Sequence, residues 1–100
     1  MQVLWKVGNK TIILGGGDVE LKFIELNTSL IRQLDKIEEE KDEFVEALAN
    51  IDNENLIEEF WDVVQAMMGV IDRRGVSIEE LMKGREEHYN KLESRGHIFK

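Results

Sequence analysis

The sequence contains no cysteine and no proline, and it has no long apolar run. Without cysteine, the chain forms no disulfide bond and no thiolate zinc site, and it has no cysteine nucleophile. No stretch approaches the roughly 18 apolar residues that a membrane-spanning helix needs. The N-terminal residues 1–6 lack the basic region and apolar run of a signal peptide. We therefore expect a cytoplasmic protein that does not bind membranes.

Positive charge is also scarce, because the sequence contains 13 lysines and arginines but 21 acidic residues, which gives a net charge of −8. This balance argues against binding to nucleic-acid polymers or to anionic membrane surfaces. It does not exclude a nucleotide substrate, because bound metal ions can invert the local sign of an acidic site. A length of 100 residues fits one domain over 1–100, with a modest core that oligomerisation would help to stabilise.

The N-terminal part of the chain, residues 1–22, differs from the rest in composition. Val3–Val7 and Lys10–Leu14 are rich in β-branched and aromatic residues, and they flank a Gly-Asn pair that suits a tight turn. We expect a short β-hairpin there, followed by a glycine-rich link at Gly15–Asp18. This link lacks the endings of known phosphate-binding loops. Residues 19–26 are compatible with a third strand or with the approach to the first helix.

The remaining part, residues 27–100, has the periodicity of α-helices. Apolar residues recur at three- and four-residue spacing from about 29 to 49 and from about 54 to 74. A capping box at Ser77 opens a third helix, which extends to about Arg95. The short connection makes the first two helices antiparallel neighbours. We predict a mainly α fold, an antiparallel bundle of about three helices with a short N-terminal β-hairpin.

Apolar stripes predict which helix faces are buried. The expected stripe of the first helix, in which only Lys41 is polar, is Leu30, Leu34, Ile37, Lys41, Phe44 and Leu48. The stripe of the second helix is Leu56, Phe60, Val63, Val64, Met67 and Ile71, widened by Ile57, Trp61 and Met68. This second face is too broad for one partner helix, so we expect it to make contacts on two sides.

Two clusters of acidic residues lie at the edges of these faces. Glu39, Glu40 and Glu43 form an E-E-x-x-E pattern, and Glu59 and Asp62 form an E-x-x-D pattern on the next helix. Acids three apart share one side of a helix, and in an antiparallel pair the two clusters come level. Carboxylate oxygens are the ligands that Mg²⁺ prefers. The alternative is solvated helix surface, because 21 acids will place some at this spacing by chance.

This succession of motifs resembles that of the MazG-like all-α nucleoside triphosphate pyrophosphohydrolases. The resemblance covers about residues 29–99 and includes Gly75–Leu81 and the closing Lys91–Phe99. It implies cleavage of a (d)NTP between the α and β phosphates, giving the monophosphate and pyrophosphate, in a house-cleaning role. It also implies a homodimer or homotetramer in which helices pair between subunits into four-helix arrangements. The family has a complete helix where this chain has its hairpin and glycine run.

The resemblance also implies roles for single residues. It implies that Mg²⁺, with Mn²⁺ as a possible substitute, is bound by four catalytic acids, Glu40, Glu43, Glu59 and Asp62. Glu39 would be a secondary metal ligand, and Lys91 and Arg95 would contact the substrate phosphates. Trp61 is the best candidate to stack on a base, although aromatic residues at helical spacing more often belong to a core. The competing hypothesis is a non-catalytic, acidic helical module for protein interaction.

Overall fold

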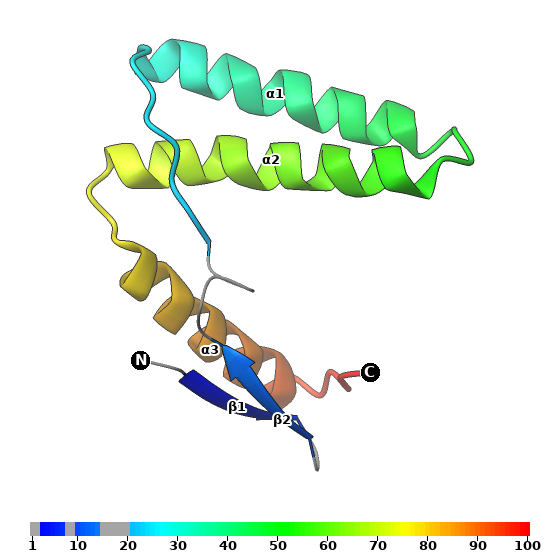
Figure 1. Ribbon diagram of the computed structural model, residues 1–100, viewed down its shortest axis with the longest axis vertical. Helices are drawn as coiled ribbons and strands as arrows, with labels where there is room; N and C mark the ends of the chain where they lie inside the picture. The colour runs from blue at the N-terminus through cyan, green and yellow to red at the C-terminus, as the bar shows by residue number, and fades with distance from the viewer. Residues whose placement is uncertain (1–2, 8–9, 15–20) are drawn as a thin grey trace.

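A computed structural model describes residues 3–7, 10–14 and 21–100 of the chain (Figure 1). It contains the helices α1 (Leu30–Ala47), α2 (Asn53–Arg73) and α3 (Ile78–Ser94). The predicted mainly α fold with three helices is therefore confirmed. Among the described residues, no helix combines the length and the apolar character needed to cross a membrane.

Two short strands precede the helices. Strands β1 (Val3–Val7) and β2 (Lys10–Leu14) pair in antiparallel fashion, with Trp5 opposite Ile12. The predicted turn between the strands and the glycine-rich link after them lie outside the described residues, so the hairpin as a whole stays a prediction. Residues 21–29 form no regular secondary structure, so this part of the segment approaches α1 without forming a third strand.

Each helix begins at a residue whose side chain caps the first turn. Ser29, Asp52 and Ser77 accept hydrogen bonds from backbone N–H groups that the helix leaves unpaired. Glu80 completes the predicted capping box by accepting from the backbone N–H of Ser77 at 3.4 Å. For α1 the cap is Ser29, whose hydroxyl accepts from the backbone N–H of Arg32 at 3.1 Å.

Helices α1 and α2 lie side by side and antiparallel, as predicted (Figure 1). The α1 face that packs on α2 follows Gln33, Glu40 and Ala47, which are all buried. Ala47 and Met68 are the buried apolar residues of the described chain, so this single chain has a very small core. The two helices thus position residues along one shared line, and this line contains polar as well as apolar side chains.

The expected burial of three leucines is not observed. Leu30, Leu34 and Leu48 remain 43%, 48% and 58% exposed. The reason is the composition of the contact line, because small and polar residues of α1 lie against α2 while these leucines point away from it. On α2, Phe60 and Met67 are also more than 40% exposed. Both helices therefore present apolar surface that the single chain leaves uncovered.

Helix α3 leaves this pair instead of packing along it (Figure 1). Gly75, with φ of 87°, ends α2 in the left-handed conformation that glycine adopts at little cost. Gly96, with φ of 85°, follows α3 in the same way. The two helices thus end close to the predicted bounds at about 74 and 95, and the chain turns away from α1 and α2 after Gly75.

The segment before α1 is attached to α2. The guanidinium of Arg73 donates to the carbonyl oxygen of Thr28 at 2.9 Å. Leu26 lies against Gly69, where an added Cβ would approach the Leu26 Cδ1 to 2.9 Å. The absence of a side chain at Gly69 therefore lets this segment lie close to the helix pair.

Candidate functional site

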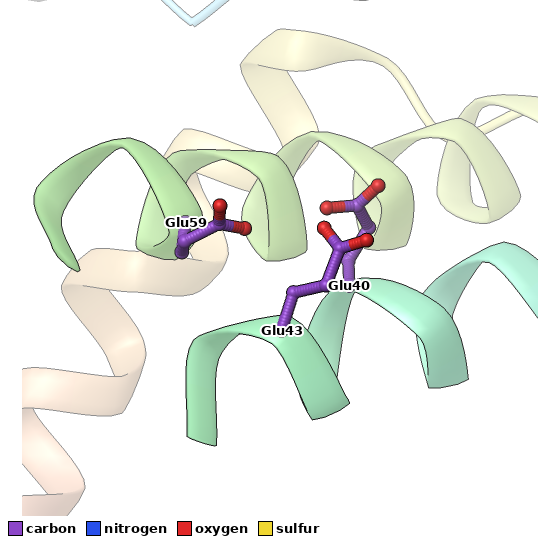
Figure 2. Close-up of side chains that lie close together, drawn as sticks. All are labelled: Glu40, Glu43 and Glu59. Atoms are coloured by element: carbon purple, nitrogen blue, oxygen red, sulfur yellow. The ribbon is translucent and has the colours of Figure 1, made fainter. Parts of the chain in front are cut away.

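Three carboxylates converge where α1 and α2 face each other. Glu40 and Glu43 extend from α1 and Glu59 from α2, and Figure 2 shows the three groups pointing toward one another. One oxygen from each lies within 4.8 Å of the others. Glu40 is buried, with 6% of its surface exposed, Glu59 is half-buried, and Glu43 is exposed. The site thus has a buried inner side and an open outer side.

The pairing of the two helices also brings Asp62 to this level. The side-chain amide of Gln33 donates to the carbonyl oxygen of Gly69 at 3.5 Å. Glu40 follows Gln33 by as many residues as Asp62 precedes Gly69, and both helices rise equally per residue. Asp62 therefore lies level with Glu40 and one turn from Glu59. It is half-buried and is not one of the three groups that converge within 4.8 Å.

Two oxygens of this site have no hydrogen-bond partner. Oε2 of Glu40 and Oε2 of Glu59 are both buried and find no partner among the residues that the structure describes. Leaving a buried carboxylate oxygen unpaired is costly, because the group has lost its water. A divalent cation would satisfy both atoms, and the donor set consists of the hard oxygens that Mg²⁺ prefers. The residues present therefore fit such an ion.

The electrostatics of the site agree with this fit. The negative charge of Glu40 raises the pKa of the Glu43 carboxyl above its ordinary value, and burial and the charge of Glu59 add to the effect. Like charges at this spacing disfavour one another's ionised forms. A cation between them would reverse the sign of the interaction.

Two basic side chains of α1 border the acids. The ammonium of Lys36 lies 2.7 Å from Oε1 of Glu40 and 3.7 Å from Oε2 of Glu39. The hydrogen bond to Glu40 and the charge of that carboxylate raise the pKa of Lys36. Arg32 pairs with Glu39 at 3.2 Å. Glu39, predicted as a secondary ligand, thus pairs with these two cations.

Sequence analysis did not single out Lys36 or Arg32. A signal was available for Lys36, because a lysine four residues from a glutamate on a helix is placed to form an ion pair. Arg32 and Glu39 are seven residues apart, so they share one face of α1 two turns apart, and the long arginine side chain spans this distance.

The other predicted site residues lie elsewhere. Lys91 and Arg95 are exposed at the end of α3, which points away from the helix pair, so a single chain does not bring them to the acids (Figure 1). Trp61 is 49% exposed and packs edge-to-face on Phe60, with ring centroids 5.1 Å apart. Phosphate binding by the two basic residues and base stacking by Trp61 stay predictions.

A small cavity lies between the segment before α1 and the two helices. Its volume is about 230 Å³. Its lining residues are Leu26, Thr28, Arg32, Gln33, Lys36 and Ala66. Because Lys36 also pairs with Glu40, this side chain connects the cavity with the acidic site.

We expect Mn²⁺ to raise the melting temperature of the protein. A bound ion relieves the repulsion among the acids, and binding to the folded state alone adds about 2.7 kcal/mol at 100 times the Kd. Thermal melts with Mn²⁺, with and without excess EDTA, measure this shift. A melting temperature that millimolar Mn²⁺ leaves unchanged would contradict the metal site.

Comparison with known protein families gives one finding. A family model described as phosphoribosyl-ATP pyrophosphohydrolase matches residues 23–87. The matched stretch contains all of α1 and α2, and therefore the three converging acids and Asp62, whereas Lys91 and Arg95 lie beyond it. Comparisons with curated proteins and with solved structures gave no match.

Proposed function

Because the chain belongs to the phosphoribosyl-ATP pyrophosphohydrolase family, we propose that it hydrolyses a nucleoside triphosphate between the α and β phosphates. The products are a nucleoside monophosphate and pyrophosphate. Family membership supports the activity of a nucleotide pyrophosphohydrolase. The observation that carries the proposal is the convergence of Glu40, Glu43 and Glu59 with two buried, unpaired carboxylate oxygens.

In this proposal the acidic site holds Mg²⁺, with Mn²⁺ as a substitute. Glu40, Glu43 and Glu59 would supply oxygen ligands to the ion. Asp62, at the same level of the helix pair, would supply a fourth, and Glu39 would be a secondary ligand. When bound, such an ion neutralises phosphate charge and lowers the pKa of a bound water.

The carboxylates of the chain also serve the transfer of the proton. The oxygen of water forms a bond to the α-phosphorus, the bond from that phosphorus to the oxygen bridging the α and β phosphates breaks, and pyrophosphate leaves with the electron pair. One of the site carboxylates accepts the proton of the attacking water, which general-base catalysis requires. The open side at Glu43 gives water and phosphate access.

Two substrate classes share the bond that is cleaved. One is a canonical or non-standard (d)NTP, whose removal would clean the nucleotide pool of the cytoplasm. The other is phosphoribosyl-ATP, which the name of the family states. Both carry a triphosphate, and they differ in what lies beyond it.

We expect pyrophosphate release from at least one substrate of a panel assayed with Mg²⁺. The panel contains ribo- and deoxyribonucleoside triphosphates, damaged nucleotides and phosphoribosyl-ATP. Release that EDTA abolishes would establish the activity and identify the substrate class. If no substrate of the panel releases pyrophosphate and the protein does not bind Mn²⁺, a non-catalytic interaction module would be favoured.

We further propose that the chain assembles into a homodimer or homotetramer with helices paired between subunits. The exposed apolar residues of α1 and α2 favour this assembly; they include Leu30, Ile31, Leu34, Val45, Leu48, Ile57, Phe60, Trp61 and Met67. Because α3 extends away from its own helix pair, Lys91 and Arg95 would then contact phosphates bound to another subunit. Trp61 would stack on the base.

A further inference from the structure

Lys36 lies between the acidic site and the cavity. Its ammonium is 2.7 Å from the buried Glu40, yet 51% of its side chain is exposed. The same side chain lines the cavity together with Arg32. One flexible cation therefore has access to both places.

We propose that Lys36 is a phosphate-binding residue that leaves Glu40 when the metal binds and pairs with the triphosphate of the substrate. The adjoining cavity then receives part of the nucleoside. This inference rests on the proposed function, because it concerns how the same site binds its substrate.

Electrostatics favours the exchange. The ammonium of Lys36 pairs with Glu40, and a metal ion at this carboxylate would take over that role. A dication at the same carboxylate repels the ammonium, and a polyphosphate offers it several strong acceptors. Half of the Lys36 side chain is exposed, so its long stem can adopt another rotamer once the ion pair with Glu40 is replaced.

The chemistry of the cavity suits the part of a nucleotide beyond its phosphates. Leu26 and Ala66 provide apolar walls, whereas the buried side-chain amide of Gln33 is already hydrogen-bonded to Gly69 and Arg73. Small-molecule sites are lined mostly by apolar groups, so these walls suit an apolar part of the nucleoside. A volume of about 230 Å³ is below the usual range for a whole ligand, so only part of the nucleoside enters. Arg32 and Lys36 also line the cavity, and their cationic ends pair with Glu39 and Glu40.

The test compares Lys36→Met with Lys41→Met by calorimetry. Lys41 is a matched control, because it lies on the same helix, is 52% exposed and pairs with Glu38 and Asp42 instead of the site acids. The probes are Mn²⁺ alone and inorganic triphosphate with Mg²⁺. We expect Lys36→Met to bind Mn²⁺ more tightly and triphosphate about 10- to 100-fold more weakly, the loss typical of one charge-assisted hydrogen bond. Lys41→Met should change both constants by less than about 3-fold.

Three results would overturn the exchange. Triphosphate binding that is equal in both variants would show that Lys36 does not contact phosphate. Weaker Mn²⁺ binding in Lys36→Met would show that the lysine stays on Glu40 and positions it. A wild-type chain that binds no Mn²⁺ would defeat the proposed function, and the inference would fall with it.

Ala66→Leu tests the cavity separately, because the larger side chain fills it. We expect weaker binding of an α,β-methylene analogue of the nucleotide hydrolysed in the panel, and unchanged binding of inorganic triphosphate. Equal affinity of the variant and the wild type for the analogue would exclude the cavity as the nucleoside site. Circular dichroism confirms that both the Lys36 and the Ala66 variants are folded.

Discussion

The Glu43→Gln variant is expected to lose turnover while the protein stays folded. Glu43 supplies one of the three converging carboxylates, and its replacement removes a charged oxygen ligand. The side chain is exposed, so the amide leaves no buried group unpaired. Even supporting residues of metal sites commonly cost 10- to 100-fold when they are lost, so we expect a loss of at least about 100-fold. Pyrophosphate release at saturating Mg²⁺ measures the effect.

The melting temperature of Glu43→Gln separates lost chemistry from lost structure. Because Glu40 raises the pKa of Glu43, removing the charge relieves repulsion, and the metal-free variant should melt no lower than the wild type. Glu38→Gln is the matched control, because it removes the same charge from an exposed position on α1 that pairs with Lys41. Asp62→Asn should lose turnover as well. Full turnover in both Glu43→Gln and Asp62→Asn would refute the site assignment.

The Phe60→Glu substitution is expected to dissociate the proposed assembly and to destabilise the protein. Phe60 is 46% exposed beside Trp61 on the apolar surface of α2. A charge buried there on association would weaken it by about 2–4 kcal/mol, the cost typical of a central aromatic residue. Among the described residues, the separated chain has only Ala47 and Met68 as buried apolar residues. We therefore expect the melting temperature to decrease together with the molecular mass of the particle in solution.

Light scattering after size exclusion, together with thermal melts, measures both effects. Ile98→Glu is the control, because it makes the same kind of change at a residue that is 93% exposed after α3. It should retain the mass of the wild type. A wild-type protein that is monomeric at all concentrations would rule out the proposed assembly, and so would a Phe60→Glu variant that associates normally.

The features that were predictable from the sequence follow local rules. The capping box at Ser77 and Glu80 and the left-handed glycines need only neighbours along the chain. The same holds for Glu40 and Glu43, whose spacing fixes that they share one side of α1. To predict that these two residues lie close to Glu59, one must also infer that α1 and α2 pair in antiparallel fashion, which follows from the short connection between them.

The features that were missed depend on contacts between distant segments. Nothing local to Gln33 indicates its burial, which follows from its hydrogen bond to Gly69 across the helix pair. The exposure of Leu34 likewise reflects which face of α1 meets α2. Leu26 is one wall of the cavity and also lies against Gly69, a contact that helical periodicity cannot show.

The pairing of α1 with α2 determines where the chain can change its length. Residues 48–52 connect the two helices beyond the acidic site, so an insertion or deletion there leaves the alignment of Glu40 with Asp62 intact. One residue added within α1 between Gln33 and Glu40 would instead turn the glutamates by about 100° relative to the anchored end. The connection therefore tolerates changes in length, whereas the helical stretch between the Gln33 contact and the acids does not.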